Sequence, residues 1–290
     1  MKFSLVGDSL RDGWVVAKAV LGRPRRGKRT AEVVGRDYDS GDWRRLLDQR
    51  DWLSFLRLED YLAAPAGTRS RIVDGRVVRL STEAYNREKI RHLSVVLETG
   101  PRCIIEFGCG TGWNHLALRV AGYEGRYFGL DISQAGILAA QQRSDHFQLQ
   151  NHDFRTGDMT DRHTWPPSTV VNYEDATCFS YLSLEQIPGL ADVFVREAWS
   201  KGIKVLYLFE SSSPRASNWY SRVLSGVYLR AKDYQRDLGK VLNRLQQQGV
   251  VVEWGQSAPV LSPRLFNEVS VYKVILGGRP DPSEATKAIL

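Results

Sequence analysis

Cysteine is scarce in this sequence, and long apolar runs are absent. The three cysteines, Cys103, Cys109 and Cys178, are odd in number and show no Cys-x-x-Cys spacing, which argues against a disulfide framework and against a zinc site. No apolar run approaches the roughly 18 residues of a membrane-spanning helix. Asp8 and Arg11 stand where a secretory signal would be apolar. These absences predict a cytoplasmic protein with no membrane partner.

Composition places the chain among ordinary globular proteins. Its 290 residues are 42% hydrophobic and 25% charged, with a net charge of +7, which suits one large domain or a domain with an extension. Part of the excess charge is local, in one short segment that contains Arg23, Arg25, Arg26, Lys28 and Arg29. Such a segment can bind phosphates or remain a solvated loop. The charge is therefore compatible with a nucleic-acid partner, but we favour a solvated loop.

The most informative stretch is residues 104–114, which read Ile-Ile-Glu-Phe-Gly-Cys-Gly-Thr-Gly-Trp-Asn. An apolar run enters a loop with three glycines at alternate positions, Gly108, Gly110 and Gly112, and Glu106 stands two residues before the first of them. Glycines allow a tight turn and a close approach of the backbone to a ligand. A second apolar run, residues 127–130, ends at Asp131. The pattern predicts a strand, a glycine loop, a helix, a second strand and an acid that can bind a ribose.

This arrangement resembles motifs I and II of the class I S-adenosylmethionine-dependent methyltransferases. The nicotinamide fingerprint is spaced differently, because no glycine lies three residues after Gly110. The resemblance spans about residues 83–278. It implies an α/β fold with a Rossmann-like, mostly parallel sheet whose last strand is antiparallel. It also implies S-adenosyl-L-methionine as the cofactor.

Apolar patterning divides the rest of the chain. Residues 1–82 are expected to form an α+β extension, either a cap or a dimerisation element, and residues 279–290 a flexible tail. Within the extension we expect a short strand at 14–20, helical spacing over 43–63 and a hairpin around Asp74 and Gly75. In the domain we expect helices at 83–98, 112–120, 134–143, 190–199 and 234–245. The expected strands are 103–107, 126–130, 147–153, 168–175 with its exit, 205–210, 250–254 and 270–276.

The family resemblance assigns cofactor contacts to several residues. It implies that Glu106 and the three glycines cradle the methionine end and that Asp131, with Ile132 beside it, holds the ribose. It implies that Asp153 and Phe154, after the third strand, lie near the adenine. It also implies that Tyr85 and Arg87, on the helix before the first strand, lie near the methionine end. Asn172 is a further candidate for cofactor binding.

The acceptor is expected at the carboxyl end of the fourth strand, where Tyr173, Glu174 and Asp175 are the catalytic candidates. With Glu185 and Glu210 they would make an acidic site, which suits a cationic nitrogen; solvated loop acids would give the same pattern. The run loosely resembles the two-glutamate loop of arginine methyltransferases, although its two glutamates lie 11 positions apart and the β-barrel of those enzymes is missing.

We therefore expect methylation of a small amino or guanidino compound. The alternatives are a nucleic-acid methyltransferase, a small-molecule O-methyltransferase and a non-catalytic cofactor-binding subunit. A homodimer is compatible with the extension. Because the histidines are scattered through polar segments, we expect no metal site.

Overall fold

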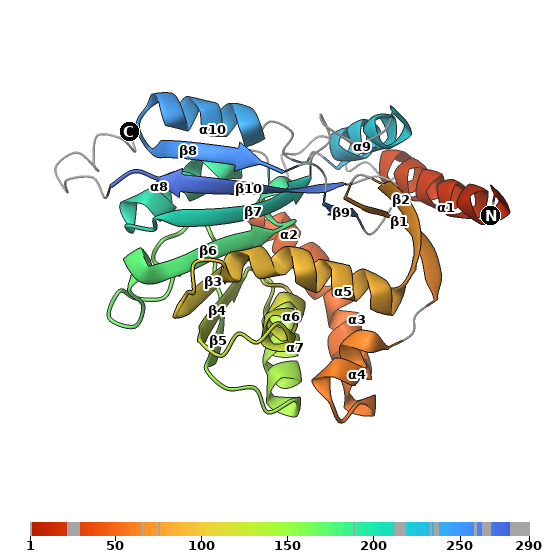
Figure 1. Ribbon diagram of the computed structural model, residues 1–290, viewed down its shortest axis with the longest axis horizontal. Coiled ribbons are helices and arrows are strands. Elements are labelled where there is room, and N and C mark those ends of the chain that lie inside the picture. Colours follow the sequence, from red (N-terminus) through yellow and green to blue (C-terminus); the bar gives the residue numbers. More distant parts are fainter. Residues whose placement is uncertain are drawn as a thin grey trace.

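A single mixed sheet organises the chain (Figure 1). The computed structural model describes residues 2–21, 30–64, 67–74, 76–187, 189–211, 219–232, 234, 238–257, 260–262 and 268–278. The basic segment around residues 23–29 and the expected tail at 279–290 lie outside these described residues. Within them, no helix is both long and apolar enough to cross a bilayer.

The centre of the sheet has five parallel strands in the order β5-β4-β3-β6-β7. They are β3 (Cys103–Phe107), β4 (Arg126–Asp131), β5 (His152–Thr156), β6 (Ala176–Tyr181) and β7 (Val205–Ser211). Next to β7 lies β10 (Val269–Leu276), which is antiparallel to it and pairs in turn with antiparallel β8 (Val251–Gln256). The predicted Rossmann-like sheet with an antiparallel end is confirmed.

Helices cover both faces of this sheet. On one face the core contains residues of α5 (Thr82–Leu93), α6 (Trp113–Val120) and α7 (Gln134–His146), and the 3₁₀ turn η2 (Ser94–Leu97) follows α5. On the other face the core contains residues of α8 (Leu190–Ser200) and α10 (Leu238–Gln247). Strand residues therefore alternate between two apolar layers, as expected for a sheet that is buried on both sides.

The N-terminal extension joins the same sheet. Strands β1 (Thr68–Val73) and β2 (Arg76–Ser81) form the predicted hairpin, and β1 pairs with β9 (Leu261–Ser262), which pairs with β10. The extension also contains α1 (Lys2–Leu21), α2 (Ala31–Asp39), α3 (Asp42–Gln49), the 3₁₀ turn η1 (Asp51–Ser54) and α4 (Leu58–Ala63). Helix α9 (Trp219–Ala231) packs against α1. The hairpin thus extends the domain's own sheet.

Three sequence-based assignments outside the fourth strand were wrong. Residues 14–20 belong to helix α1, whose buried positions Asp12, Val16 and Ala19 recur at helical spacing. The helical segment 43–63 is broken, because Arg50 adopts a left-handed conformation after α3. The third strand begins at His152, since Gln148 and Asn151 have positive φ angles that end any earlier strand.

The error with the largest consequence concerns the fourth strand. Residues 168–175 form turns instead of a strand: the carbonyl oxygen of Pro167 accepts hydrogen bonds from the amides of Val170 and Val171, and a 3₁₀ turn, η3 (Tyr173–Asp175), follows. Strand β6 starts only at Ala176. The β-branched run favoured a strand by propensity, but the preceding prolines place it in a turn. The predicted acceptor residues therefore lie at the beginning of the fourth strand.

Candidate cofactor and acceptor site

The glycine loop after β3 requires glycine at its three positions. Gly108, Gly110 and Gly112 have φ angles of 78°, 53° and 73°, a region that residues with a side chain seldom adopt. A Cβ atom at Gly108 would lie 2.3 Å from the Cβ of Ser183 in the loop after β6. A Cβ atom at Gly112 would lie 2.8 Å from the Cβ of Ala140 in α7. The loop is therefore pressed between neighbouring elements and exposes backbone instead of side chains.

A cavity of about 340 Å³ opens beside this loop, at the carboxyl ends of the parallel strands. Its walls come from the glycine loop, from the residues that follow β4, β5 and β6, and from helices α2, α3 and α5. The lining includes Val34, Tyr38, Trp43, Lys89, Gly108, Gly110, Asn114, Asp131, Ile132, Asp158, Met159, Tyr181, Ser183 and Gln186. Ligands of open α/β sheets bind at this edge.

Asp131 ends β4 and is buried against the glycine loop. Its carboxylate accepts hydrogen bonds from the amide of Gly110 (N to Oδ2, 2.8 Å) and from the amide of Ser133 (N to Oδ1, 2.9 Å). Burial raises the pKa of Asp131 to about 6, and the two amide hydrogen bonds oppose that rise. Each carboxylate oxygen keeps a lone pair for a further donor. Asp131 and Ile132 line the cavity where the sequence placed them.

Glu106 lies beneath the cavity, fully buried in β3. It accepts a hydrogen bond from Asn114 (Nδ2 to Oε1, 2.5 Å) and another from the hydroxyl of Tyr127. Burial raises its pKa to about 7, while these two hydrogen bonds and the nearby Lys89 cation oppose the rise. Because Asn114 lines the cavity and Glu106 does not, Glu106 acts on the cavity by positioning Asn114.

Lys89 on α5 is a cavity residue that the sequence analysis missed. Its ammonium nitrogen lies 3.8 Å from the ring centre of Trp113 and 4.4 Å from that of Tyr181. Desolvation lowers its pKa to about 7, although Glu106 raises it. The helix was predicted correctly, but its candidates face elsewhere. Tyr85 is buried under the guanidinium of Arg71, and exposed Arg87 pairs with Glu83.

Lys89 is the cation in the cavity wall best placed to bind a ligand's carboxylate. We predict that Lys89→Met weakens binding of S-adenosylhomocysteine about tenfold or more below pH 7, because a charge-assisted hydrogen bond contributes about 1.5–3 kcal/mol. The difference should shrink above pH 7, where the natural lysine loses its proton. Calorimetric titrations of both proteins across this range test the assignment. A difference that does not change with pH would contradict it.

The N-terminal extension forms part of the cavity wall. Trp43 of α3 stacks on Tyr38 of α2 with ring centres 4.0 Å apart, and the Tyr38 hydroxyl donates a hydrogen bond to Gln186 (Oη to Oε1, 2.8 Å). Asp39 accepts a hydrogen bond from the amide of Ala135 at the start of α7 (2.9 Å). These contacts join the extension to both sides of the cavity. No local sequence motif pointed to this role.

Residues near the third strand differ from the expectation. Asp153 lies within β5 and forms an ion pair with Arg155 (Nη2 to Oδ2, 2.6 Å), while Phe154 is buried next to Gly112 and Gly129. The strand continues to Thr156. As a result, the residues that leave its carboxyl end and line the cavity are Gly157, Asp158 and Met159.

The predicted catalytic group lies at the opposite edge of the sheet. Asn172, Tyr173, Glu174 and Asp175 precede β6, and Glu174 faces Lys204 ahead of β7 (Oε2 to Nζ, 3.7 Å). Asn172 donates a hydrogen bond to Asp175 (Nδ2 to Oδ2, 2.6 Å), and the hydroxyl of Tyr173 donates to the carbonyl oxygen of Pro166. These four residues therefore cannot contact a ligand in the cavity.

Glu185 and Glu210 remain as acids on the cavity side of the sheet. Both are buried, Glu185 in the 3₁₀ turn η4 (Leu184–Gln186) and Glu210 near the end of β7. Glu210 accepts hydrogen bonds from Ser180 (Oγ to Oε1, 2.8 Å), from the amide of Leu184 (3.2 Å) and from the amide of Glu185 (3.2 Å). Burial raises the pKa of Glu210 to about 8, and the neighbouring Glu185 charge adds to the rise.

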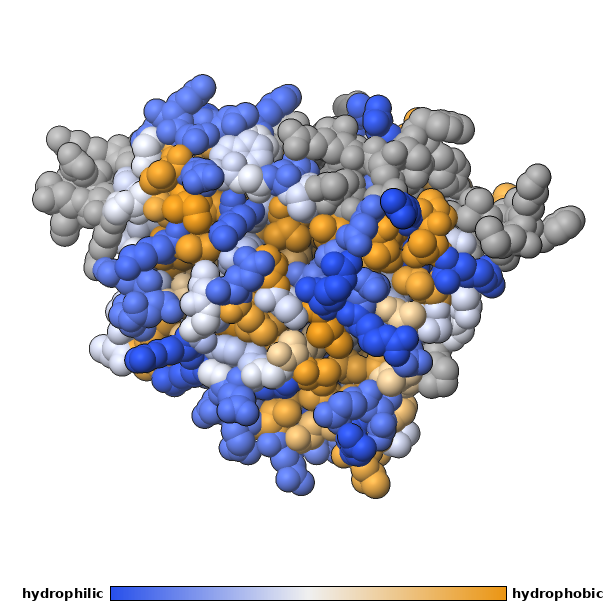
Figure 2. All heavy atoms as spheres, viewed as in Figure 1, coloured by the Kyte–Doolittle hydropathy of each residue, from blue (hydrophilic) through white to orange (hydrophobic). Residues whose placement is uncertain are grey.

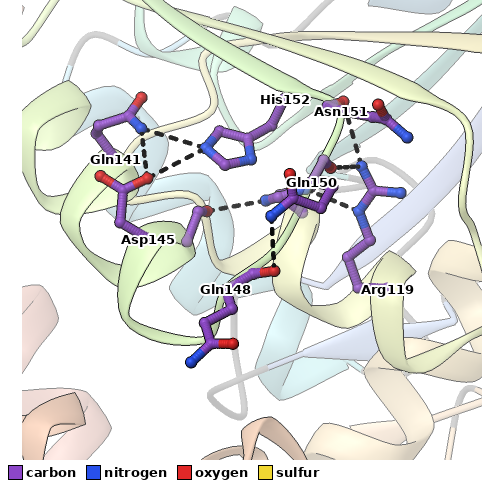
Figure 3. Close-up of polar contacts among 9 residues, drawn as sticks. Arg119, Gln141, Asp145, Gln148, Gln150, Asn151 and His152 are labelled. Atoms are coloured by element: carbon purple, nitrogen blue, oxygen red, sulfur yellow. Dashed lines mark hydrogen bonds and ion pairs between the residues drawn. The ribbon is translucent and has the colours of Figure 1, made fainter.

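His152 belongs to a packing network at the amino end of β5 (Figure 3). His152 contacts Gln141 (Nε2 to Nε2, 3.2 Å), which donates to Asp145. Arg119 of α6 donates to the carbonyl oxygens of Gln150 and Asn151. The network ties α6 and α7 to the start of β5, at the edge of the sheet opposite the cavity. Among the described residues, no group of three or more metal-ligating side chains forms.

Comparison with known proteins supports the interpretation of the cavity at the carboxyl ends of the strands as a cofactor site. Residues 102–170 match the model of a methyltransferase domain family. The magnesium protoporphyrin IX methyltransferase of Synechocystis PCC 6803, solved with bound SAH, has a similar structure, with a TM-score of 0.51 and 16% identity over 84% of this chain and 99% of that one. The cyclase SpnF gives a TM-score of 0.51 and 15% identity, over 87% of this chain and 98% of that one. A search of curated proteins found no match.

Together these findings support the predicted resemblance to methyltransferases, through a matched segment of the chain and a shared fold. The family match covers β3 with the glycine loop, β4 and β5. The structural similarity at this level of identity concerns the fold, and the cyclase indicates that the fold also serves another reaction. The reaction and the acceptor must therefore be argued from the residues of the site.

Proposed function

We propose that this chain, which contains a class I methyltransferase domain, transfers the methyl group of S-adenosylmethionine to a small polar acceptor, with nitrogen as the preferred atom. The observation that supports this most strongly is the cavity at the carboxyl ends of the parallel strands, bounded by the glycine loop and Asp131. The similar magnesium protoporphyrin IX methyltransferase, solved with bound SAH, supports the choice of cofactor.

The cavity residues suit each part of this cofactor. The backbone of the glycine loop would lie against the methionine portion. Lys89 would bind the carboxylate of this portion, and its amino group would lie near Asn114, which Glu106 positions. Asp131 would accept the ribose hydroxyls. Ile132 and Met159 offer apolar contacts for a purine, and Asp158 offers an acceptor for an exocyclic amine. When bound, the cofactor supplies an electrophilic methyl group on a sulfonium.

The acceptor would approach over the carboxyl ends of β6 and β7. Here the proposal of an amino or guanidino nitrogen depends on Glu185 and Glu210, since Glu174 and Asp175 lie at the other edge. Burial raises the pKa of Glu210 to about 8, so this carboxylate can take a proton from an ammonium or guanidinium group, and the amide of Glu185 donates a hydrogen bond to it. Ser183 and Gln186 flank Glu185 and line the cavity, which brings this loop next to the cofactor position.

The test uses matched variants of the two glutamates that the sequence emphasised. Glu185→Gln is expected to lower turnover about a hundredfold or more, because general acid–base catalysis contributes about 10²–10⁴-fold, while S-adenosylhomocysteine affinity changes little. Glu174→Gln should leave both quantities unchanged. The substrates would be amino, guanidino and hydroxyl compounds together with RNA. Equal turnover in Glu185→Gln would remove this residue from the site, and methylation of RNA alone would refute the small-molecule proposal.

A further inference from the structure

Helices α1 and α9 form an apolar and basic surface away from the cofactor cavity. We define it by the described side chains Leu10, Arg11, Trp14, Lys18 and Leu21 of α1, and Val223, Val227 and Arg230 of α9. The two helices pack against each other. Figure 2 shows apolar and hydrophilic side chains interspersed over the face of the molecule that it presents. The lining of the cavity contains none of these residues, so the methyltransferase site does not explain the surface.

The apolar part of this surface is too exposed for a packing role. Trp14 is 64% exposed, Leu10 71% and Leu21 81%. They occur at positions i, i+4 and i+11, which lie on one side of a helix, while Asp12, Val16 and Ala19 face the protein. On α9, Val223 is 55% exposed and Val227 37%, again one turn apart. Exposed apolar side chains that gather on one side of neighbouring helices are typical of interaction surfaces.

The exposed charged side chains that the structure describes on α1 and α9 are all basic. Arg11 and Lys18 are exposed on α1, one beside each end of the Trp14 turn, and Arg222 and Arg230 are exposed on α9. Among the side chains described on these two helices, the only acid is Asp12, which is buried. Five further cations follow in the sequence shortly after Leu21, between residues 23 and 29. The partner should therefore be anionic.

We propose that the α1–α9 surface binds anionic lipid bilayers from the side, without spanning them. This proposal departs from the expectation of no membrane partner, which rested on the absence of a long apolar run. Helices that lie in the headgroup region of a bilayer have one stripe of apolar side chains, often with tryptophan, and cations next to that stripe. A nucleic acid would meet the cations but would leave Leu10, Leu21 and Val223 in water. A second copy of the chain would place basic surface against basic surface. The bilayer is the partner that uses both features.

Vesicle co-sedimentation of the full chain tests this proposal, with neutral phosphatidylcholine vesicles and vesicles that also contain phosphatidylglycerol. We expect binding to the mixed vesicles that weakens with added salt. Arg11→Gln with Lys18→Gln should weaken it about 30-fold, at about 1 kcal/mol for each cation near the surface. Leu10→Ser with Trp14→Ser should weaken it at least about tenfold, from lost apolar burial. Leu53→Ser with Leu56→Ser, two exposed leucines outside the surface, is the matched control and should bind normally.

Several results would overturn the proposal. These are no binding to either vesicle, equal loss in the Leu53 and Leu56 control, or a dimer in sedimentation equilibrium that only the Leu10 and Trp14 variant disrupts. Binding of RNA that the surface variants abolish, with no vesicle binding, would identify a nucleic-acid partner instead. S-adenosylhomocysteine affinity, measured on every variant, reports whether the domain is folded. It also keeps a failure of this proposal distinct from a failure of the proposed methyl transfer.

Discussion

Replacing Asp131 with alanine should weaken binding of S-adenosylhomocysteine at least about a hundredfold. The substitution removes the carboxylate that would accept hydrogen bonds from two ribose hydroxyls. Hydrogen bonds to a charged group contribute about 1.5–3 kcal/mol each. The same change leaves the buried amides of Gly110 and Ser133 without their acceptor. The free energy of unfolding should therefore also fall, by about 2 kcal/mol or more. Calorimetry gives the affinity, and denaturant unfolding gives the stability.

A control variant separates the two effects of this substitution. Asp39→Ala removes an acceptor from the amide of Ala135 and from the hydroxyl of Ser133, at the same end of α7. We expect it to destabilise the protein by about 1 kcal/mol, as the loss of a helix cap does, while leaving the affinity within a few fold of the natural protein. If folded Asp131→Ala kept its affinity, the ribose assignment of Asp131 would be wrong.

Gly108→Ala should abolish cofactor binding by moving the loop. The added Cβ would lie 2.3 Å from the Cβ of Ser183, a separation that packed atoms do not tolerate, so the glycine loop or the loop after β6 must shift. The φ angle of 78° at this position adds about 1–2 kcal/mol of strain for a residue with a side chain. We expect no detectable binding and an unfolding midpoint lowered by several degrees, measured by calorimetry and thermal denaturation.

A double variant distinguishes the steric effect from the backbone strain. Ser183→Gly removes the atoms that the new Cβ would meet, together with one hydrogen bond to the carbonyl oxygen of Phe107 (Oγ to O, 2.9 Å). Gly108→Ala combined with Ser183→Gly should regain part of the affinity that Gly108→Ala loses. Should the single variant Gly108→Ala bind as well as the natural protein, the loop could not lie against the ligand as proposed.

Local patterns predicted the parts of the site that local geometry determines. The glycine loop and Asp131 were recognisable because a tight turn demands glycine and because an apolar strand ends abruptly at an acid. The strand, loop and second strand follow one another within about thirty residues, so that their contacts need no knowledge of distant segments. The family match covers the same part of the chain.

The remaining site depends on boundaries and on tertiary packing. Residues 168–175 were assigned to the fourth strand and its exit, whereas the strand starts only at Ala176. This displacement moved Glu174 from one edge of the sheet to the other. On α5 the helix was predicted, but which residue faces the cavity depends on how the helix packs, and it is Lys89 instead of Arg87. Trp43 and Tyr38 come from the extension, about 70 residues before the glycine loop in the sequence, and nothing in their local pattern indicates that contact.

Calorimetric titration of the unmodified protein with S-adenosylhomocysteine tests the central claim most directly, because it needs no knowledge of the acceptor. The glycine loop, Asp131 and Lys89 together predict saturable binding at one site per chain. Competition by S-adenosylmethionine, and none by a nicotinamide dinucleotide, should accompany it. The absence of binding by folded protein would contradict the assignment of the cavity, and with it the proposed methyl transfer.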